Sequence, residues 1–421
     1  MNKDKWGKKN RYYHKDIEKL LDFLVPKSSS VLKIDCSKGE IPIEKLKISK
    51  KYDYIVALDL IGFSKDIQKT FQQIYKMTHS KSRVILTYHS YLWEPILKIA
   101  EKLKLKRPQS FQNWLVSSDI QNLLYLAGFE IIKKGERILI PKYIPLISTL
   151  FNKYLAKLPL LRKLCLNRYF VVRPYPKKKL LKEPSVSVVI AARNERGNIE
   201  SAVKRVPKIG SHTEIIFVEG GSNDNTFEEI KRIQQKYSEK DIRVFKQPGK
   251  GKGDAVRKGF DKAKGDILMI LDADLTVEPE ELPKFYKAIV NGSGDFINGC
   301  RLIYPLEKES MRFLNILGNK FFGLAFSWIL DQRIKDTLCG TKVLRKEDYE
   351  KVKAGRKFFG DFDPFGDFDL IFGAAKLNLK IIDLPIRYKE RTYGSTNISR
   401  FSNGWLLLKM SVFAAKKIKF I

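Results

Sequence analysis

Two aspartates separated by one residue follow an apolar run in the segment GDILMILDADLTVEP, residues 265–279. The run Ile267–Leu271 is wholly apolar and has the length of a buried strand, so it would deliver Asp272 and Asp274 to solvent at its end. Two carboxylates at this spacing can jointly hold a hard cation such as Mg²⁺ or Mn²⁺. Such a cation would neutralise a diphosphate and stabilise the negative charge that develops when a bond to that diphosphate breaks.

Two segments upstream also carry polar residues directly after an apolar strand pattern. VSVVIAARNE, residues 186–195, breaks from a buried strand into a polar turn, and EIIFVEGGSNDNT, residues 214–226, ends in an acid and a Gly-Gly turn. A carboxylate such as Glu219 at a strand end can accept hydrogen bonds from a base or a ribose. Asp224 fits the same site, and it serves equally well as the N-cap of the helix that follows.

A glycine-rich segment, QPGKGKGDAVRKGF, occupies residues 247–260. Its glycines leave the backbone free to approach phosphate groups, while Lys250 and Lys252 supply positive charge. The segment is not a P-loop, because the pattern G-x-x-x-x-G-K-[ST] is not met.

In their order along the chain (186–195, 214–226, 247–260 and 265–279), the four segments resemble family 2 glycosyltransferases of the GT-A fold. The likeness is to dolichol- and polyprenyl-phosphate sugar synthases, and it extends over residues 185–421. It implies an inverting hexosyltransferase that takes a sugar from a UDP- or GDP-sugar, with Mg²⁺ or Mn²⁺ on Asp272 and Asp274. One departure is Glu219-Gly220-Gly221, where the family has Asp-Asp or Asp-Gly. The nucleotide-sugar site that the resemblance implies comprises Ala191, Arg193, Glu195, Glu219, Asp224, Lys252, Asp272 and Arg301.

The resemblance also implies an acceptor side, carried by residues 333–349, 359–376 and 387–399. The catalytic candidates there are Asp336, Asp367, Asp369 and Arg391, and the phosphate-binding candidates are Arg387, Arg391 and Ser395. Arginines suit bidentate binding of phosphate oxygens. A lipid phosphate acceptor is already ionised and needs no strong base, whereas a glycan hydroxyl would require one of the three aspartates to remove a proton. The sequence is compatible with either acceptor, a lipid phosphate or a glycan hydroxyl.

The N-terminal half carries a weaker likeness. VLKIDCSKGE, residues 31–40, resembles the first motif of class I S-adenosylmethionine methyltransferases, but only Gly39 remains of its usual glycines. About a dozen residues separate Gly39 from YDYIVALD, residues 52–59, so the strand whose acid binds the cofactor ribose is expected to be absent. We expect a truncated, Rossmann-like domain retained for packing or partner binding, with negligible S-adenosylmethionine affinity and no assigned site.

The length of the chain and its pattern of apolar residues predict the domain organisation. A chain of 421 residues favours two domains, and the alternation of apolar strand patterns with amphipathic helical patterns predicts two α/β units with mostly parallel sheets. The expected boundaries are a methyltransferase-like domain at 1–145, a basic, proline-marked linker at 146–184 and the GT-A domain at 185–421.

The amino-acid composition indicates which partners and which cellular location to expect. The net charge of +33 favours an anionic partner, either a membrane surface or a nucleic acid, but no nucleic-acid-binding module is present. Residues 313–330 and 401–418 combine apolar residues with lysines, which predicts helices lying in a membrane interface. Scattered cysteines, with no secretory signal, favour a cytoplasmic protein peripheral to the membrane. A non-catalytic or nucleic-acid-binding scaffold is the alternative from another class.

Overall fold

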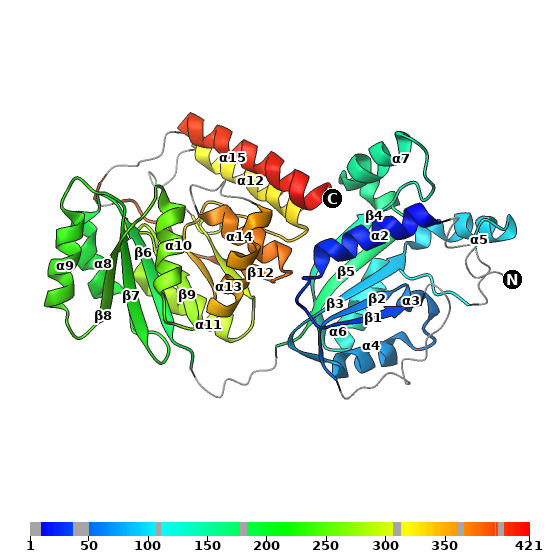
Figure 1. Cartoon of the computed structure of the whole chain (residues 1–421), viewed down its shortest axis with the longest axis horizontal. Helices are drawn as coiled ribbons and strands as arrows, with labels where there is room; N and C mark the ends of the chain where they lie inside the picture. Colours follow the sequence, from blue (N-terminus) through cyan, green and yellow to red (C-terminus); the bar gives the residue numbers. More distant parts are fainter. Residues whose placement is uncertain are drawn as a thin grey trace. The chain divides into compact units, whose positions relative to one another are not determined.

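A computed structural model describes residues 10–36, 50–106, 111–176, 183–305, 313–359, 366–391, 393–394 and 400–421. The chain divides into two compact units (Figure 1), of which the first comprises Met1–Lys177 with Lys416–Ile421 and the second Lys178–Ala415. Each unit has its own sheet and its own apolar core.

The N-terminal unit is built on a five-stranded sheet in the order β1-β2-β3-β5-β4. The first three strands are parallel, and β5 runs antiparallel to both of its neighbours. The strands are β1 (Val31–Asp35), β2 (Tyr52–Leu58), β3 (Thr78–His89), β4 (Phe129–Arg137) and β5 (Asn167–Pro174). The helices are α2 (Arg11–Leu24), α3 (Leu60–Phe63), α4 (Ile67–Lys76), α5 (Glu94–Lys102), α6 (Ser117–Leu126) and α7 (Ile147–Thr149), with single turns η2 (Tyr91–Trp93), η3 (Leu150–Tyr154), η4 (Leu155–Lys157) and η5 (Leu161–Leu164).

The linker expected over residues 146–184 is wrong for most of its length. Residues 146–174 belong to the N-terminal unit, and β5 within them pairs with both β3 and β4 inside the sheet. The order β1-β2-β3 agrees with an α/β unit, while the likeness to methyltransferases remains a prediction, and Gly39 lies outside the described residues.

The C-terminal unit is built on a seven-stranded sheet in the order β12-β10-β11-β9-β6-β7-β8. Only β11 runs antiparallel to its neighbours among the paired strands. The strands are β6 (Val186–Ala192), β7 (Thr213–Glu219), β8 (Asp241–Lys246), β9 (Ile267–Ile270), β10 (Phe296–Cys300), β11 (Lys342–Arg345) and β12 (Ile381–Pro385). The helices are α8 (Arg196–Arg205), α9 (Thr226–Lys236), α10 (Lys252–Lys262), α11 (Leu282–Val290), α12 (Phe313–Leu330), α13 (Lys346–Gly355), α14 (Asp367–Lys376) and α15 (Arg400–Ala414), with single turns η6 (Pro279–Glu281) and η7 (Arg356–Phe358). A last turn, η8 (Ala415–Lys419), begins at the final residue of this unit and otherwise belongs to the N-terminal unit.

This topology brings several strand ends to one edge of the sheet. The strands β6, β7 and β9 are parallel, and their apolar residues are buried because the sheet is covered on both faces. The strand β10 points the same way as β9, since both are antiparallel to β11. The polar residues that follow β6, β7, β9 and β10 therefore gather at one edge, together with the turn that enters β11. Ligands of open α/β sheets bind at such an edge.

Candidate active site

The two aspartates predicted from the sequence follow β9 and are each paired with a cation. Lys252, the first residue of α10, forms an ion pair with Oδ1 of Asp272. Nη2 of Arg391 donates to Oδ2 of Asp274 over 2.7 Å, and Oδ1 of Asp274 accepts the Thr276 hydroxyl over 2.9 Å. The structure thus places one lysine and one arginine from distant parts of the chain on the two carboxylates.

The charges of the Lys252–Asp272 pair stabilise each other. Burial alone would raise the pKa of Asp272, but the Lys252 ammonium outweighs it and the pKa is lowered. Burial alone would lower the pKa of Lys252, but the carboxylates of Asp272 and Asp367 outweigh it, so the pKa is raised. Asp272 is therefore ionised at neutral pH and remains an anionic oxygen donor.

Arg391 joins the turn after β9 to the turn after β6. Besides Asp274, its guanidinium reaches Oε1 of Glu195, with Nη1 3.3 Å away. The second oxygen of Glu195 accepts Nδ2 of Asn198 over 2.7 Å, and burial raises the pKa of Glu195. These contacts show that Glu195, Asp274 and Arg391, predicted from three separate motifs, lie in one site.

Two carboxylates, Glu219 at the end of β7 and Asp224 in the turn after it, accept hydrogen bonds from backbone N–H groups. Oε1 of Glu219 accepts the N–H of Ser222 over 2.5 Å. Asp224 accepts the N–H groups of Thr226 over 3.1 Å and of Arg196 over 3.2 Å, so it holds the starts of α9 and α8. The N-cap of α9 is Asn225, so the expectation that Asp224 is the N-cap is wrong by one residue, although Asp224 bonds the first residue of α9, Thr226.

The remaining nucleotide-side candidates border the same edge. Ala191 is half-buried near the end of β6, and Arg193 is exposed in the turn that follows, with its Cβ facing Gly220.

Asp336 and Arg301 are partners of each other. The guanidinium binds the carboxylate in a fork, with Nε 2.8 Å from Oδ2 and Nη2 2.9 Å from Oδ1, and the backbone N–H of Arg301 adds a third bond. The residue Asp336 is 0% exposed. Burial would raise its pKa, but Arg301 outweighs it and the pKa is lowered. Arg301, expected at the nucleotide, thus neutralises the acid expected at the acceptor.

The other two candidate acids are also paired. Asp367 lies 2.9 Å from Nζ of Lys342, a fully buried lysine, and Asp369 lies 2.8 Å from Nε of Arg356. Arg387 is exposed and lies over the ring of Tyr304 at 6.0 Å. Ser395 falls outside the described residues. The structure therefore places a cation on each of the three proposed bases.

The sequence alone did not identify Lys342 and Arg356, which pair with Asp367 and Asp369, and it did not identify Gly340. Lys342 and Arg356 carried no motif, although a lysine in an apolar strand pattern signals a buried partner. Gly340 lies in the turn that enters β11, where a Cβ would collide with the Asp272 carboxylate and the Lys252 ammonium. The Cys-Gly pair of residues 339–340 was the available signal for this close approach.

Residues 187–353 match the family model described as glycosyl transferase family 2. This segment is a family 2 glycosyltransferase domain. The match confirms the family part of the sequence prediction for this segment.

Curated relatives are similar to this chain over about half of its length. A dolichol-phosphate mannosyltransferase of Pyrococcus furiosus is 34% identical over 220 residues, which are 51% of this chain and 59% of that protein. A low-salt glycan biosynthesis hexosyltransferase of Haloferax volcanii is 28% identical over 229 residues, 53% of this chain and 52% of that protein. The chain thus spans little more than half the length of these curated relatives. A solved glucosyl-3-phosphoglycerate synthase of Mycobacterium tuberculosis is 18% identical, with a TM-score of 0.42 over 56% of this chain and 80% of that one.

A side chain at Gly340 is expected to impair the glycosyltransferase site without unfolding it. In Gly340→Ala the new methyl group would displace the flexible ends of Asp272 and Lys252, so we expect donor turnover to fall about tenfold or more. The free energy of unfolding should change by less than about 1 kcal/mol, because the colliding atoms are side-chain ends. Gly355→Ala is the control, since its Cβ meets nothing within 4 Å. Equal turnover in the two variants, measured as nucleoside diphosphate release, would show that Gly340 has no such role.

Proposed function

We propose that this protein transfers a sugar from a UDP- or GDP-sugar to a polyprenyl phosphate, with inversion at the anomeric carbon. The observation that carries the proposal is the convergence of Asp272, Asp274, Lys252 and Arg391 at the edge of a family 2 glycosyltransferase domain. Two carboxylates and two cations at one point suit a metal-bound diphosphate. The Pyrococcus relative, named for transfer to dolichol phosphate, supports the acceptor, as does an undecaprenyl-phosphate 4-deoxy-4-formamido-L-arabinose transferase of Edwardsiella ictaluri, 33% identical over 111 residues.

The carboxylates fit Mg²⁺ or Mn²⁺ held jointly with a substrate. Among the described residues there is no group of three or more His, Cys, Asp or Glu side chains that would hold a metal by itself. Asp272 and Asp274 would therefore supply one or two ligands, and phosphate oxygens and water the others, which is the usual arrangement for Mg²⁺. The bound cation would stabilise the charge that develops on the departing nucleoside diphosphate.

The cations of the site have a role of their own. Lys252 and Arg391 are paired with the two aspartates, and both can turn their N–H groups toward phosphate oxygens. Arg391 is suited to a bidentate contact, while Lys252 acts as a point charge. In this proposal they orient the donor diphosphate and the acceptor phosphate.

The ion pairs of the acidic residues favour a phosphate acceptor over a hydroxyl. Asp336, Asp367 and Asp369 each contact a cation, and the pKa of Asp336 is lowered, which makes it a poor proton acceptor. A phosphate oxygen is already ionised. It can form the new bond to the anomeric carbon while the bond to the nucleoside diphosphate breaks, with no proton removed.

The helices expected at a membrane interface expose apolar side chains. The helices α12 and α15 pack against each other (Figure 1, yellow and red). The exposed residues recur at helical spacing and are Leu317, Phe321 and Leu324 on α12 and Trp405, Leu408 and Val412 on α15. Within the described residues no helix is long and apolar enough to span a bilayer. We propose that these faces lie in the cytoplasmic membrane interface, where a lipid phosphate is found.

A glycan hydroxyl is the second candidate acceptor, favoured by the name of the Haloferax relative. Product analysis separates the two. With a radiolabelled donor, polyprenyl phosphate and Mn²⁺, we expect label in an organic-extractable product, and EDTA should abolish its formation. Label that enters only an added glycan would refute the lipid acceptor.

A further inference from the structure

Residues 143–164 of the N-terminal unit, hereafter the 143–164 segment, turn an apolar surface to solvent. Leu146 is 86% exposed and Leu160 is 79% exposed. Isolated exposed leucines are ordinary, but a contiguous group of this size marks an interaction surface. The exposed apolar residues are Tyr143, Ile144, Leu146, Ile147, Leu150, Phe151, Tyr154, Leu158, Leu160 and Leu164.

Two polar residues of the same segment, Ser148 and Asn152, are turned inward. Ser148 is buried, and its Oγ donates to the carbonyl of Lys142 over 2.7 Å. Asn152 is buried as well, and its Oδ1 accepts the N–H groups of Leu139 over 2.7 Å and Ile140 over 2.9 Å. These bonds fix the backbone of the segment. Its leucines therefore face outward as a consequence of a defined, hydrogen-bonded fold.

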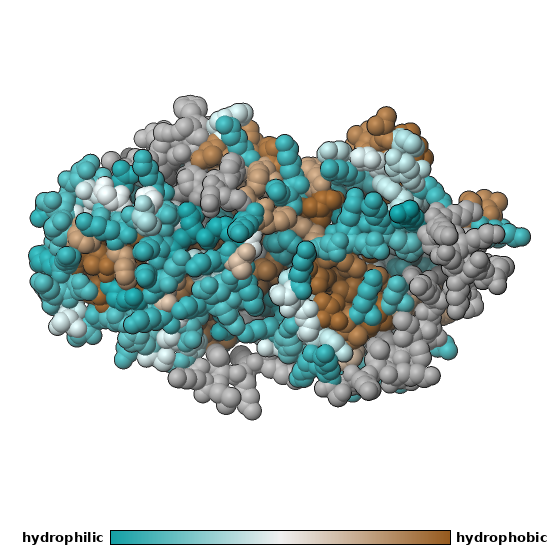
Figure 2. Space-filling view, viewed as in Figure 1, coloured by the Kyte–Doolittle hydropathy of each residue, from teal (hydrophilic) through white to brown (hydrophobic). Residues whose placement is uncertain are grey.

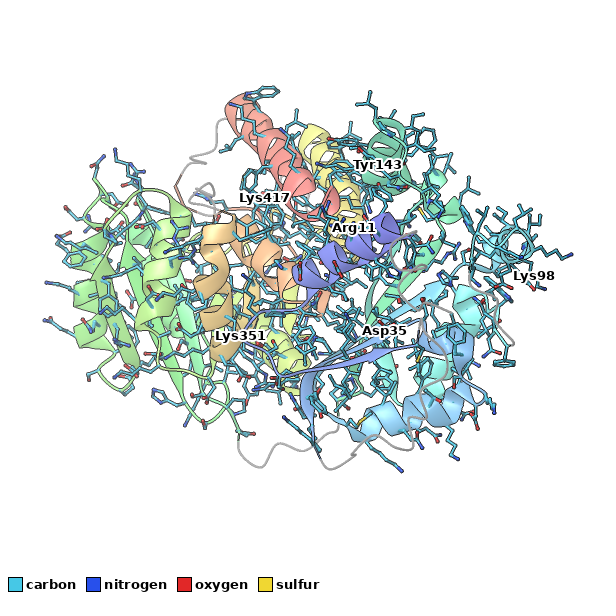
Figure 3. All side chains as sticks on the ribbon, turned by 45° about the vertical axis from the view of Figure 1, so that its right-hand side comes forward. Arg11, Asp35, Lys98, Tyr143, Lys351 and Lys417 are labelled. Carbon is cyan, nitrogen blue, oxygen red and sulfur yellow. The ribbon has the colours of Figure 1, made fainter. Side chains whose placement is uncertain are left out.

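Helix α5 extends this surface. Nε1 of Trp93, in the turn before α5, donates to the carbonyl of Leu164 over 2.8 Å and so joins the two segments. On α5 and the residues beside it, the exposed apolar side chains are Tyr91, Leu92, Ile96, Ile99 and Leu103. Figure 2 shows hydrophobic atoms around α7, and Figure 3 shows Lys98 of α5 projecting at the outer edge of the unit. We call the 143–164 segment and α5 together the apolar platform.

The 143–164 segment carries the positive charge of the platform, whereas the two acids of α5, Glu94 and Glu101, balance its two lysines, Lys98 and Lys102. Residues 141–166 contain no Asp or Glu and five basic residues, of which Lys157 is buried: Lys142, Lys153, Lys157, Arg162 and Lys163. Lys153 and Lys163 are exposed among the leucines. Protein interfaces are depleted in lysine, whereas leucines and tyrosines interleaved with lysines are typical of a surface that lies in an anionic lipid interface. Lysine stems add to the apolar area while their ammonium groups reach the headgroups.

We propose that the apolar platform binds the N-terminal unit to an anionic bilayer, with its leucines and isoleucines inserted at the headgroup level. The platform belongs to the N-terminal unit, whereas α12 and α15 belong to the C-terminal unit, and its binding does not depend on sugar transfer. It would give the N-terminal unit a role that requires no methyltransferase site: to hold the enzyme on the membrane.

Flotation or co-sedimentation of the full chain with vesicles tests the proposal. Wild-type protein should bind vesicles of phosphatidylcholine with phosphatidylglycerol, and more weakly vesicles of phosphatidylcholine alone. In Leu146→Ser/Leu160→Ser two highly exposed side chains become polar, so we expect affinity for the anionic vesicles to fall about tenfold or more. The control is Val31→Ser/Leu126→Ser, which changes two exposed apolar residues of the same unit outside the platform. It should bind as wild type.

Release of nucleoside diphosphate without lipid separates this proposal from the transferase. It should be equal in wild type and in both double variants, because none of the changed residues lies in the candidate active site. Unchanged vesicle binding in Leu146→Ser/Leu160→Ser would overturn the proposal. So would loss of self-association or of a protein complex in that variant with vesicle binding intact, since the platform would then be a protein interface.

Discussion

Replacement of Asp274 by Asn is expected to lower donor turnover by about a thousandfold while the protein remains folded. The amide keeps the size of the carboxylate and can still accept the bonds from Thr276, so the turn after β9 should persist. The negative charge that would help hold a divalent cation is lost, and so is the anionic partner of Arg391. Turnover is measured as nucleoside diphosphate release at saturating Mn²⁺, and folding by the thermal unfolding midpoint.

A carboxylate at the other end of the same strand provides the matched control. Asp266 precedes β9, and its Oδ2 accepts the N–H and the hydroxyl of Ser185. Asp266→Asn should turn over donor as wild type does. If Asp274→Asn retained the same activity as Asp266→Asn, Asp274 would not be a metal ligand.

Replacement of Asp336 by Asn is expected to lower the free energy of unfolding by about 3–5 kcal/mol, because it leaves the Arg301 guanidinium buried without its carboxylate. The same ion pair also makes the free energy of unfolding depend on pH. Because the pKa of Asp336 is lowered in the fold, the stabilisation is complete above its unfolded value and is lost as the pH falls through the lower, folded value. Chemical denaturation measures both effects.

Two controls distinguish a structural ion pair from a catalytic base. Asp261→Asn removes the charge opposite Lys353 in an exposed pair, while its amide oxygen can still accept the Tyr349 hydroxyl, so it should cost less than about 1 kcal/mol. The double variant Asp336→Leu/Arg301→Met removes both charges, and should recover much of the stability lost in Asp336→Asn. Wild-type stability together with abolished transfer in Asp336→Asn would instead favour a base.

The parts of the fold that follow from local pattern were predictable. The strand β9 is wholly apolar, and Asp272 follows one residue after it, so its position and its exposed end could be placed from the sequence. The positions of β6 and β7 could be placed from their apolar runs in the same way. The strand β5 was missed because proline and lysine clusters on both sides suggested a linker, while its pairing with β3 and β4 depends on tertiary contacts.

The site was predictable in its residue types but not in its pairings. Arg391 and Asp274 lie 117 positions apart, and only the sheet topology shows that β12 leads back to the edge where β9 ends. The same topology places Arg301 on Asp336. The role of Asp336 therefore changes from a proposed base to one half of a buried ion pair, which sequence spacing alone could not indicate.

The most direct test of the transferase proposal is the rate of nucleoside diphosphate release from UDP- and GDP-sugars with Mn²⁺ or Mg²⁺, with and without polyprenyl phosphate. We expect release from at least one donor, a clear increase when the lipid phosphate is added, and none with EDTA. Release that does not respond to the lipid would retain a glycosyltransferase but contradict the lipid acceptor. No release from any donor, with or without lipid, would contradict the catalytic proposal itself.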